Sequence, residues 1–187
     1  MLETERLRLR NWQPSDREPF ARMNADPRVM EFFPKRLTRE ESDAMVDRIE
    51  EHFRSKGFGL YAAELRGDGR FVGYVGLHTP TFQARFMPTV EIGWRLASDV
   101  WGQGLATEGA RAVARHAFQD LSLEEIVSFT VPGNQRSIRV MQNLGMTRDA
   151  VEDFEHPNLP AGHPLRHHVL YRLRDSDKRQ LIGRRIG

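Results

Sequence analysis

Small and polar residues gather in one short segment, Gly102-Gln103-Gly104-Leu105-Ala106-Thr107, which follows a strand-like stretch and precedes a helix-like one. The first N–H groups of a helix have no acceptor within the helix, and the helix dipole makes that end positive. Glycines in the turn let the backbone approach a ligand closely. The segment is therefore typical of a site that binds a phosphate group.

The spacing of these residues separates the known kinds of phosphate loop. The G-x-x-x-x-G-K-[ST] loop of nucleotide kinases does not occur in the chain. The dinucleotide fingerprint is matched in part, because Glu124 and Glu125 follow Gly104 by roughly 20 residues and could serve as the ribose-binding acid. That fingerprint normally follows the first strand, whereas here several strand-like stretches come first. An NAD-dependent oxidoreductase therefore stays as an alternative.

Three segments together resemble one family. Trp101 to Ala106 is similar to a pyrophosphate loop of the form Q/R-x-x-G-x-G/A, with Trp101 in place of the usual polar residue. Asn134 to Met146 is similar to the pattern N-x-x-S-x-x-V-x-x-x-x-G-F/M, and Glu3 to Arg10 reads as a first strand. These segments resemble the GNAT superfamily of N-acetyltransferases, and the opening strand resembles its Rim-type branch, which acetylates the N-termini of ribosomal proteins.

The resemblance implies that acetyl-CoA is the co-substrate and that no metal takes part. It places the pyrophosphate at the Gly-rich loop, the pantetheine arm along the strand that ends at Leu96, and a side-chain contact at Asn134. The residues that it assigns to the cofactor are Trp94, Leu96, Trp101, Gly102, Gln103, Gly104, Leu105, Ala106, Thr107 and Asn134.

Two residues are candidates for the catalytic proton transfers. Glu91 matches the strand glutamate that often activates the amine in this superfamily, although an exposed structural glutamate is the alternative. The tyrosine that often protonates the leaving thiolate is replaced by Met141, which cannot donate. In the Rim-type branch the hydroxyl at the position of Ser137 is the suggested donor. Ser137 could instead bond locally within its helix, as serines often do.

The acceptor is expected to be a primary amine. At pH 7, deprotonation costs about 1–1.4 kcal/mol for an α-amine but about 4.6 kcal/mol for lysine, so a weak base suffices at a chain terminus. The Rim-type resemblance favours a protein or peptide N-terminus over polyamines and aminoglycosides, and the loops Pro27–Pro34 and Pro80–Pro88 are expected to hold it. A non-catalytic module that binds acyl-CoA is a further alternative.

Composition restricts the remaining possibilities. The chain has 187 residues and no cysteine, so disulfides and thiolate metal sites are excluded, and one domain over residues 1–187 is expected. The net charge of +2 does not suggest a nucleic-acid binder, and no apolar run is long enough for a membrane span. We expect a cytoplasmic monomer or homodimer with a solvated tail from about residue 175.

Periodicity predicts alternating elements along the chain. Strands are expected at 6–10, 59–65, 70–77, 90–96, 126–131, 146–154 and 168–173, and helices at 14–25, 38–57, 105–119 and 134–143. Residues 66–69, Arg-Gly-Asp-Gly, should join two of the strands in a hairpin. The predicted fold class is α/β, with a mixed, mostly antiparallel sheet flanked by helices on both faces.

Overall fold

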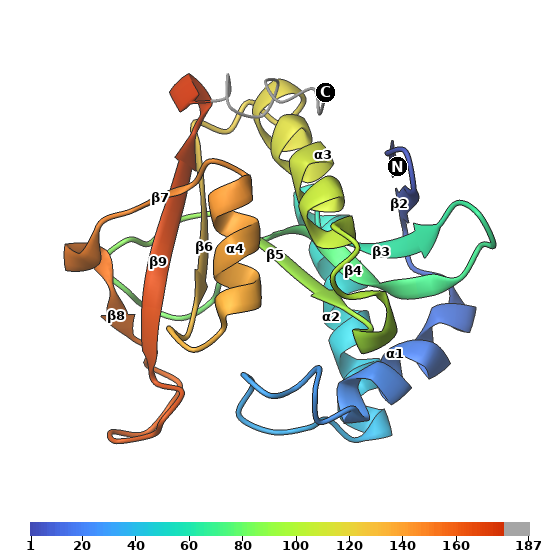
Figure 1. The fold of residues 1–187 in the computed structure, drawn as a ribbon, viewed down its shortest axis with the longest axis horizontal. Coiled ribbons are helices and arrows are strands. Elements are labelled where there is room, and N and C mark those ends of the chain that lie inside the picture. The colour runs from blue at the N-terminus through green and yellow to red at the C-terminus, as the bar shows by residue number, and fades with distance from the viewer. Residues whose placement is uncertain (178–187) are drawn as a thin grey trace. The chain divides into compact units, whose positions relative to one another are not determined.

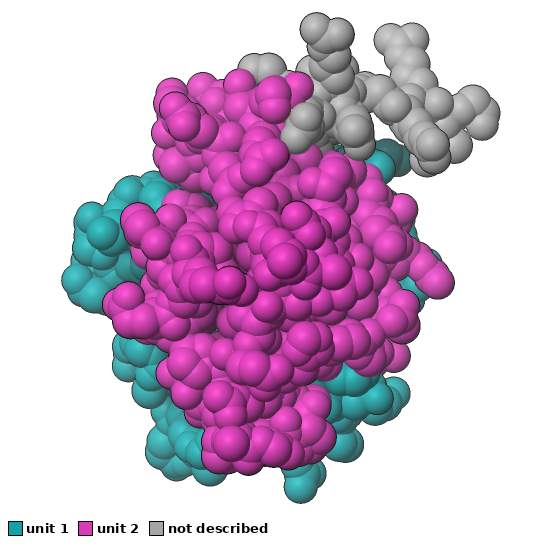
Figure 2. Space-filling model, turned by 90° about the vertical axis from the view of Figure 1, so that its left-hand side faces the viewer, with its two compact units in different colours: residues 1–78, 93–113 teal, residues 79–92, 114–187 magenta. Residues whose placement is uncertain are grey.

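The computed structural model describes residues 1–177. The chain forms two compact units, which Figure 2 shows in different colours. Unit 1 comprises Met1–His78 and Gly93–Val113, and unit 2 comprises Thr79–Ile92 and Ala114–Gly187.

Unit 1 contains an antiparallel meander and three helical segments. Its strands are β1 (Leu2–Glu3), β2 (Leu7–Arg10), β3 (Leu60–Leu65), β4 (Phe71–His78) and the end of β5 (Glu91–Leu96). Its helices are α1 (Arg17–Ala25), α2 (Arg39–Lys56) and the beginning of α3 (Leu105–Gln119), with short 3-10 turns at Pro14–Asp16 and Ser98–Val100. Each strand from β1 to β4 pairs with the next in the chain.

Local sequence signals explain the best-defined elements. Thr38 begins α2 with a capping box, in which its hydroxyl accepts from the backbone of Glu41 while the Glu41 carboxylate accepts from the backbone of Thr38. Gly57 ends the helix with a φ of 78°. The predicted hairpin is confirmed, since Gly69 donates to the carbonyl of Leu65 at 2.9 Å between β3 and β4.

Helices cover both faces of the sheet in unit 1, as predicted. Figure 1 shows α3 in front of β4 and α2 behind it. At Gly109 of α3, a Cβ would lie 3.2 Å from Val75 and 3.3 Å from Leu7, so this helix packs directly on the strands. The opposite face carries the hydrophobic core of α1 and α2, which includes Trp12, Phe20, Met23, Val46, Ile49, Ala62 and Tyr74.

Unit 2 contains a smaller mixed sheet. The start of β5 is parallel to β6 (Glu125–Thr130), and β6 is antiparallel to β9 (His167–Arg174). Two short strands, β7 (Thr147–Arg148) and β8 (Phe154–Glu155), also pair antiparallel with β9. Helix α4 (Gln135–Asn143) lies in front of β6 in Figure 1. The predicted mixed, mostly antiparallel fold class is therefore confirmed.

The predicted strand at 146–154 is wrong over most of its length. Only the two ends of this stretch pair with β9, while Ala150–Glu152 form a 3-10 turn. Asp149 initiates this turn because its side chain accepts from the backbone of Val151. At the other end of the sequence, Asp175–Asp177 form a further 3-10 turn, and the rest of the predicted solvated tail lies outside the described residues.

Aromatic rings fill the face of β6 that points away from α4. Because side chains alternate along a strand, Thr130 turns toward the start of α4 whereas Phe129 turns to the other face. There Phe129 meets Phe82 at 5.7 Å and Phe154 at 5.3 Å between ring centroids. Rings of Phe86, His156 and His168 complete this aromatic cluster.

Burial of histidines should make stability depend on pH. Desolvation lowers the pKa of His156 and His168 in the aromatic cluster, and desolvation with a smaller effect of His52 lowers the pKa of His78 to about 4. The unfolded chain therefore binds more protons below pH 6.5, so stability present above that pH is lost as pH falls. Each group contributes at most about 1.4 kcal/mol per pH unit.

Urea unfolding between pH 7.5 and pH 5 tests this expectation, with His168→Gln as the variant that should flatten the slope. His163→Gln is the matched control because that residue lies in the loop before β9 and is not part of the aromatic cluster. Equal stability across the range would contradict the expectation.

Candidate functional site

The Gly-rich loop leads directly into α3, as the sequence predicts. Gly102 and Gly104 have φ angles of 77° and 79°, a left-handed conformation in which glycine carries little strain. Both glycines and Gln103 are exposed, while Leu105 is buried and anchors the start of the helix. The first bond of α3 runs from Glu108 N–H to the carbonyl of Gly104 at 3.0 Å. The preceding N–H groups therefore have no acceptor within the helix and can bind an anion.

The turn between β1 and β2 braces this loop through Arg6. The Arg6 guanidinium donates to the carbonyl of Gln103 at 2.8 Å and to the Glu108 carboxylate at 2.7 Å. Thr4 and the backbone N–H of Arg6 donate to the same carboxylate. Burial would raise the pKa of Glu108, but these hydrogen bonds outweigh it and lower the pKa overall. Glu108 thus stays ionised and ties the first turn of α3 to the turn between β1 and β2.

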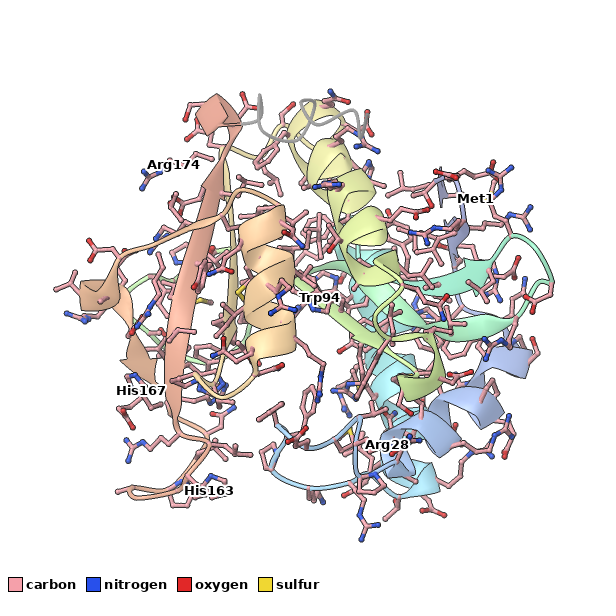
Figure 3. All side chains as sticks on the ribbon, in the orientation of Figure 1. Met1, Arg28, Trp94, His163, His167 and Arg174 are labelled. Carbon is pink, nitrogen blue, oxygen red and sulfur yellow. The ribbon has the colours of Figure 1, made fainter. Side chains whose placement is uncertain are left out.

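The aromatic residue that begins the loop points away from it. Trp101 donates its indole N–H to the carbonyl of Leu96 at 2.9 Å, and its ring packs against the core of α1 and α2. Its role in the structure is therefore to fix the loop to the end of β5. Trp94, labelled in Figure 3, is half-buried on the same strand, and Leu96 is buried.

Glu91 opens β5 in unit 2, opposite Val127 of β6. Desolvation raises the pKa of its carboxyl group well above the usual value. A carboxylate with a raised pKa is a stronger base near neutral pH, which is the property that a general base for an amine requires.

Asn134 and Ser137 meet at the start of α4. Asn134 is the N-cap residue: its side-chain oxygen accepts from the backbone N–H of Ser137 at 3.3 Å, and its amide donates to Thr130 at 3.0 Å. The Ser137 hydroxyl is half-buried and forms no hydrogen bond with the described residues. Met141 is 1% exposed and belongs to the core. Ser137 therefore has a proton available, and Met141 does not.

The structure divides the predicted site residues by unit. Trp94, Leu96 and the loop 101–107 belong to unit 1, whereas Glu91, Asn134 and Ser137 belong to unit 2. Sequence reasoning missed the Arg6 brace and a buried arginine, Arg95. The signal for Arg95 was present, because a charged residue stands between Trp94 and Leu96 in an otherwise apolar strand end.

Two negative findings apply to residues 1–177. No group of three or more histidine, aspartate or glutamate side chains there is arranged to hold a metal ion. His163 and His167, labelled in Figure 3, lie in the loop before β9 and at its first residue. None of the helices in this range is both long and apolar enough to span a membrane.

Comparison with known proteins agrees on one family. Residues 6–147 match the model of the acetyltransferase (GNAT) domain. FsC-acetyl coenzyme A-N(2)-transacetylase of Aspergillus fumigatus is 33% identical over 160 residues, which cover 82% of this chain and 66% of that protein. A GNAT-family acetyltransferase structure from Bacillus anthracis has a TM-score of 0.77 at 25% identity and covers 94% of this chain and 98% of its own. Mycobacterium smegmatis RimJ in complex with CoA-disulfide has a TM-score of 0.73 at 19% identity, with 96% and 92% covered.

Proposed function

The chain belongs to the GNAT acetyltransferase domain family and is an acetyl-CoA-dependent acetyltransferase, and we propose that its acceptor is the α-amine of a protein or peptide N-terminus. The use of acetyl-CoA is supported above all by the exposed turn at Gly102–Gly104, which opens α3 and is braced by Arg6. This cradle fits the pyrophosphate of acetyl-CoA because N–H groups without an acceptor lie at an exposed helix end.

Two arguments support this acceptor: the pKa of an α-amine, and the similarity of this chain to Rim-type enzymes. At pH 7 the protonated form of an α-amine exceeds the free base by only about 5- to 10-fold, so a single carboxylate with a raised pKa is a sufficient base. The fold resemblance to RimJ and the sequence of the opening segment Glu3–Arg10 support a Rim-type acceptor, although this segment is a hairpin of β1 and β2 and not the single strand that was predicted. We also propose that the enzyme acts in the cytoplasm as a monomer or homodimer.

In the proposed reaction the acetyl group passes directly from the thioester to the amine. Glu91 accepts the proton that the amine loses, and the C–N bond forms as the carbonyl becomes tetrahedral. The C–S bond then breaks, and Ser137 donates a proton to the departing thiolate. Because a CoA thiolate is a stable leaving group, loss of the Ser137 proton should slow the reaction without abolishing it.

Calorimetry with acetyl-CoA and NAD, followed by a peptide assay, tests the proposal. We expect binding of acetyl-CoA without binding of NAD, and acetylation of a peptide with a free N-terminus. The matched control is the same peptide with a blocked N-terminus and an internal lysine. Binding of acetyl-CoA without transfer to any amine would instead indicate a non-catalytic acyl-CoA-binding module.

Replacing Glu91 with glutamine should lower kcat by about 100-fold and leave the affinity for acetyl-CoA unchanged. Since the pKa of Glu91 is raised, the wild-type rate should fall as the pH drops through that raised pKa. The glutamine variant should not show this fall in rate. Because its pKa is raised, the ionised Glu91 carboxylate is less stable in the folded protein than in the unfolded chain. Replacing it with neutral glutamine should therefore not lower the melting temperature above pH 5. A pH–rate profile with Glu155→Gln as control checks this; an unchanged profile would make Glu91 structural.

A small-amine acceptor is the second candidate. It is favoured by the fungal relative, whose name specifies an N(2)-transacetylase and which shares 33% identity with this chain. The same assay separates the two, because a small-amine enzyme would acetylate polyamines or amino acid derivatives faster than the peptide.

A further inference from the structure

Unit 1 buries an arginine that the proposed reaction does not use. Arg95 is 8% exposed at the end of β5, although a buried guanidinium normally requires a carboxylate partner. Among the described residues it forms no ion pair. Its one short hydrogen bond runs from Nη1 to Oδ1 of Asn24, at 2.7 Å. Burying a charged group with so few hydrogen bonds costs free energy unless a ligand binds to it.

The surroundings of Arg95 hold it in one orientation. Asn24 and Ser42 are fully buried, and Asn24 donates to Ser42 at 2.9 Å, which fixes the amide so that its oxygen faces Arg95. The guanidinium carbon lies 4.0 Å from the ring centroid of Phe33 and 5.5 Å from that of Tyr74. Both distances are within the range of a cation–π contact, which occupies none of the N–H groups as a hydrogen bond would.

One edge of the guanidinium group has no partner. Nε is fully enclosed and has no hydrogen bond, and no hydrogen bond of Nη2 is formed either. Nη2, unlike Nε, is not enclosed, so its N–H groups are the ones that an anion can reach with a charge-assisted hydrogen bond. β4 holds the backbone here, since a Cβ at Gly73, whose φ is 131°, would lie 2.1 Å from the carbonyl oxygen of Arg95. The unused edge is therefore preorganised.

We propose that Arg95 binds a carboxylate group of the acceptor through Nη2, the guanidinium nitrogen that has no hydrogen bond and is not enclosed. Phe33 belongs to the segment Pro27–Pro34, which the sequence indicates as an acceptor loop, so the site lies where part of the acceptor is expected. The inference rests on the proposed acetyl transfer and adds a substrate class: an amine that also carries a carboxylate. That carboxylate can come from an acidic residue near a peptide N-terminus or from a small amino acid.

Direct binding is tested without any turnover. The Nε–H resonance of Arg95, assigned by its loss in Arg95→Lys, should shift when propionate is titrated into the protein and should not shift with propionamide. Arg70 provides the internal control, because its guanidinium already pairs with Asp99 near the surface at 2.5 Å. Absence of a propionate shift at Arg95 overturns the site.

Two series of acceptors then test the assignment to the substrate. The first compares C-terminally amidated peptides that carry Glu or Gln at the second, third or fourth residue, and the second compares ω-amino acids of increasing length with their amides. In the series that matches the true acceptor, kcat/KM should favour the carboxylate by about 10- to 100-fold. Arg95→Met should abolish the preference, with Arg70→Met as control.

The outcomes separate this inference from the proposed function. A carboxylate preference that is lost in Arg95→Met supports it, and equal rates for acid and amide in both series overturn it. If no amine is acetylated, the proposed acceptor fails, and the propionate shift alone decides whether Arg95 is an anion site. If Arg95→Met does not fold, Arg95→Lys takes its place, because lysine keeps the charge but lacks the fixed planar donors of the guanidinium group.

Discussion

Replacing Gly104 with valine is expected to weaken acetyl-CoA binding by about 100-fold or more, which corresponds to the loss of roughly two charge-assisted hydrogen bonds. Gly104 has a φ of 79° and lies in the exposed turn before α3. A Cβ there would approach Nη2 of Arg6 at 3.6 Å, and the branched side chain would occupy the space in which a phosphate meets the N–H groups of the helix. Calorimetric titration with acetyl-CoA measures the change.

Gly69→Val is the control that separates backbone strain from loss of the ligand contact. Gly69 has a φ of 72° and nothing within 4 Å of an added Cβ, but it lies in the hairpin between β3 and β4. Both substitutions should cost similar stability, since both force a branched residue into the left-handed region. Only the Gly104 variant should lose acetyl-CoA affinity. Equal affinities in the two variants would show that the phosphate does not bind at this loop.

Replacing Arg10 with methionine is expected to lower the free energy of unfolding by about 3–5 kcal/mol. Arg10 donates to both oxygens of Asp16 at 2.7 and 2.9 Å and to Glu64 at 2.7 Å. Asp16 is 2% exposed, so the variant would leave a carboxylate buried without its cation. The hydrogen bond with Asp16 is the largest cause of the raised pKa of Arg10, which therefore stays charged at any accessible pH.

The matched surface control is Arg22→Met. Arg22 pairs with Glu18 one turn away on α1, and both side chains are more than half exposed. Such a pair contributes about 0.3–0.5 kcal/mol. The loss of stability measured by urea denaturation should therefore be several-fold larger for Arg10→Met than for Arg22→Met. Similar small losses would mean that the Arg10 network relaxes or hydrates when the cation is removed.

Local signals account for the elements that the sequence predicts well. The capping box at Thr38, the turn residues after Leu65 and the Gly-rich start of α3 each act through neighbours in the chain, so their effect can be read from a short window. The strand predicted after Met146 was wrong because a local hydrogen bond there favours a different structure. Its alternation suggested a strand, but the Asp149 side chain caps a 3-10 turn instead, and no pattern of hydrophobicity reports that competition.

Local geometry was predictable where the residues are contiguous and not where it depends on distant partners. The turn at 102–104 and the start of α3 could be predicted from a short run of small and polar residues. The partners of Glu108, in contrast, are Thr4 and Arg6, about a hundred positions earlier in the chain. The isolation of Arg95 is also a property of the fold, since it depends on which side chains of α1, α2 and β4 come near it. A single sequence does not encode such proximity in any local pattern.

The bond between Arg6 and the carbonyl of Gln103 couples the turn between β1 and β2 to the Gly-rich loop. If this bond favours the loop conformation that accepts a pyrophosphate, then a ligand bound at the loop must favour the closed turn by the same free energy. Binding of the ligand should therefore protect the turn between β1 and β2 from local opening. Substitutions near Thr4 would therefore change the affinity for acetyl-CoA allosterically, without contacting the bound molecule.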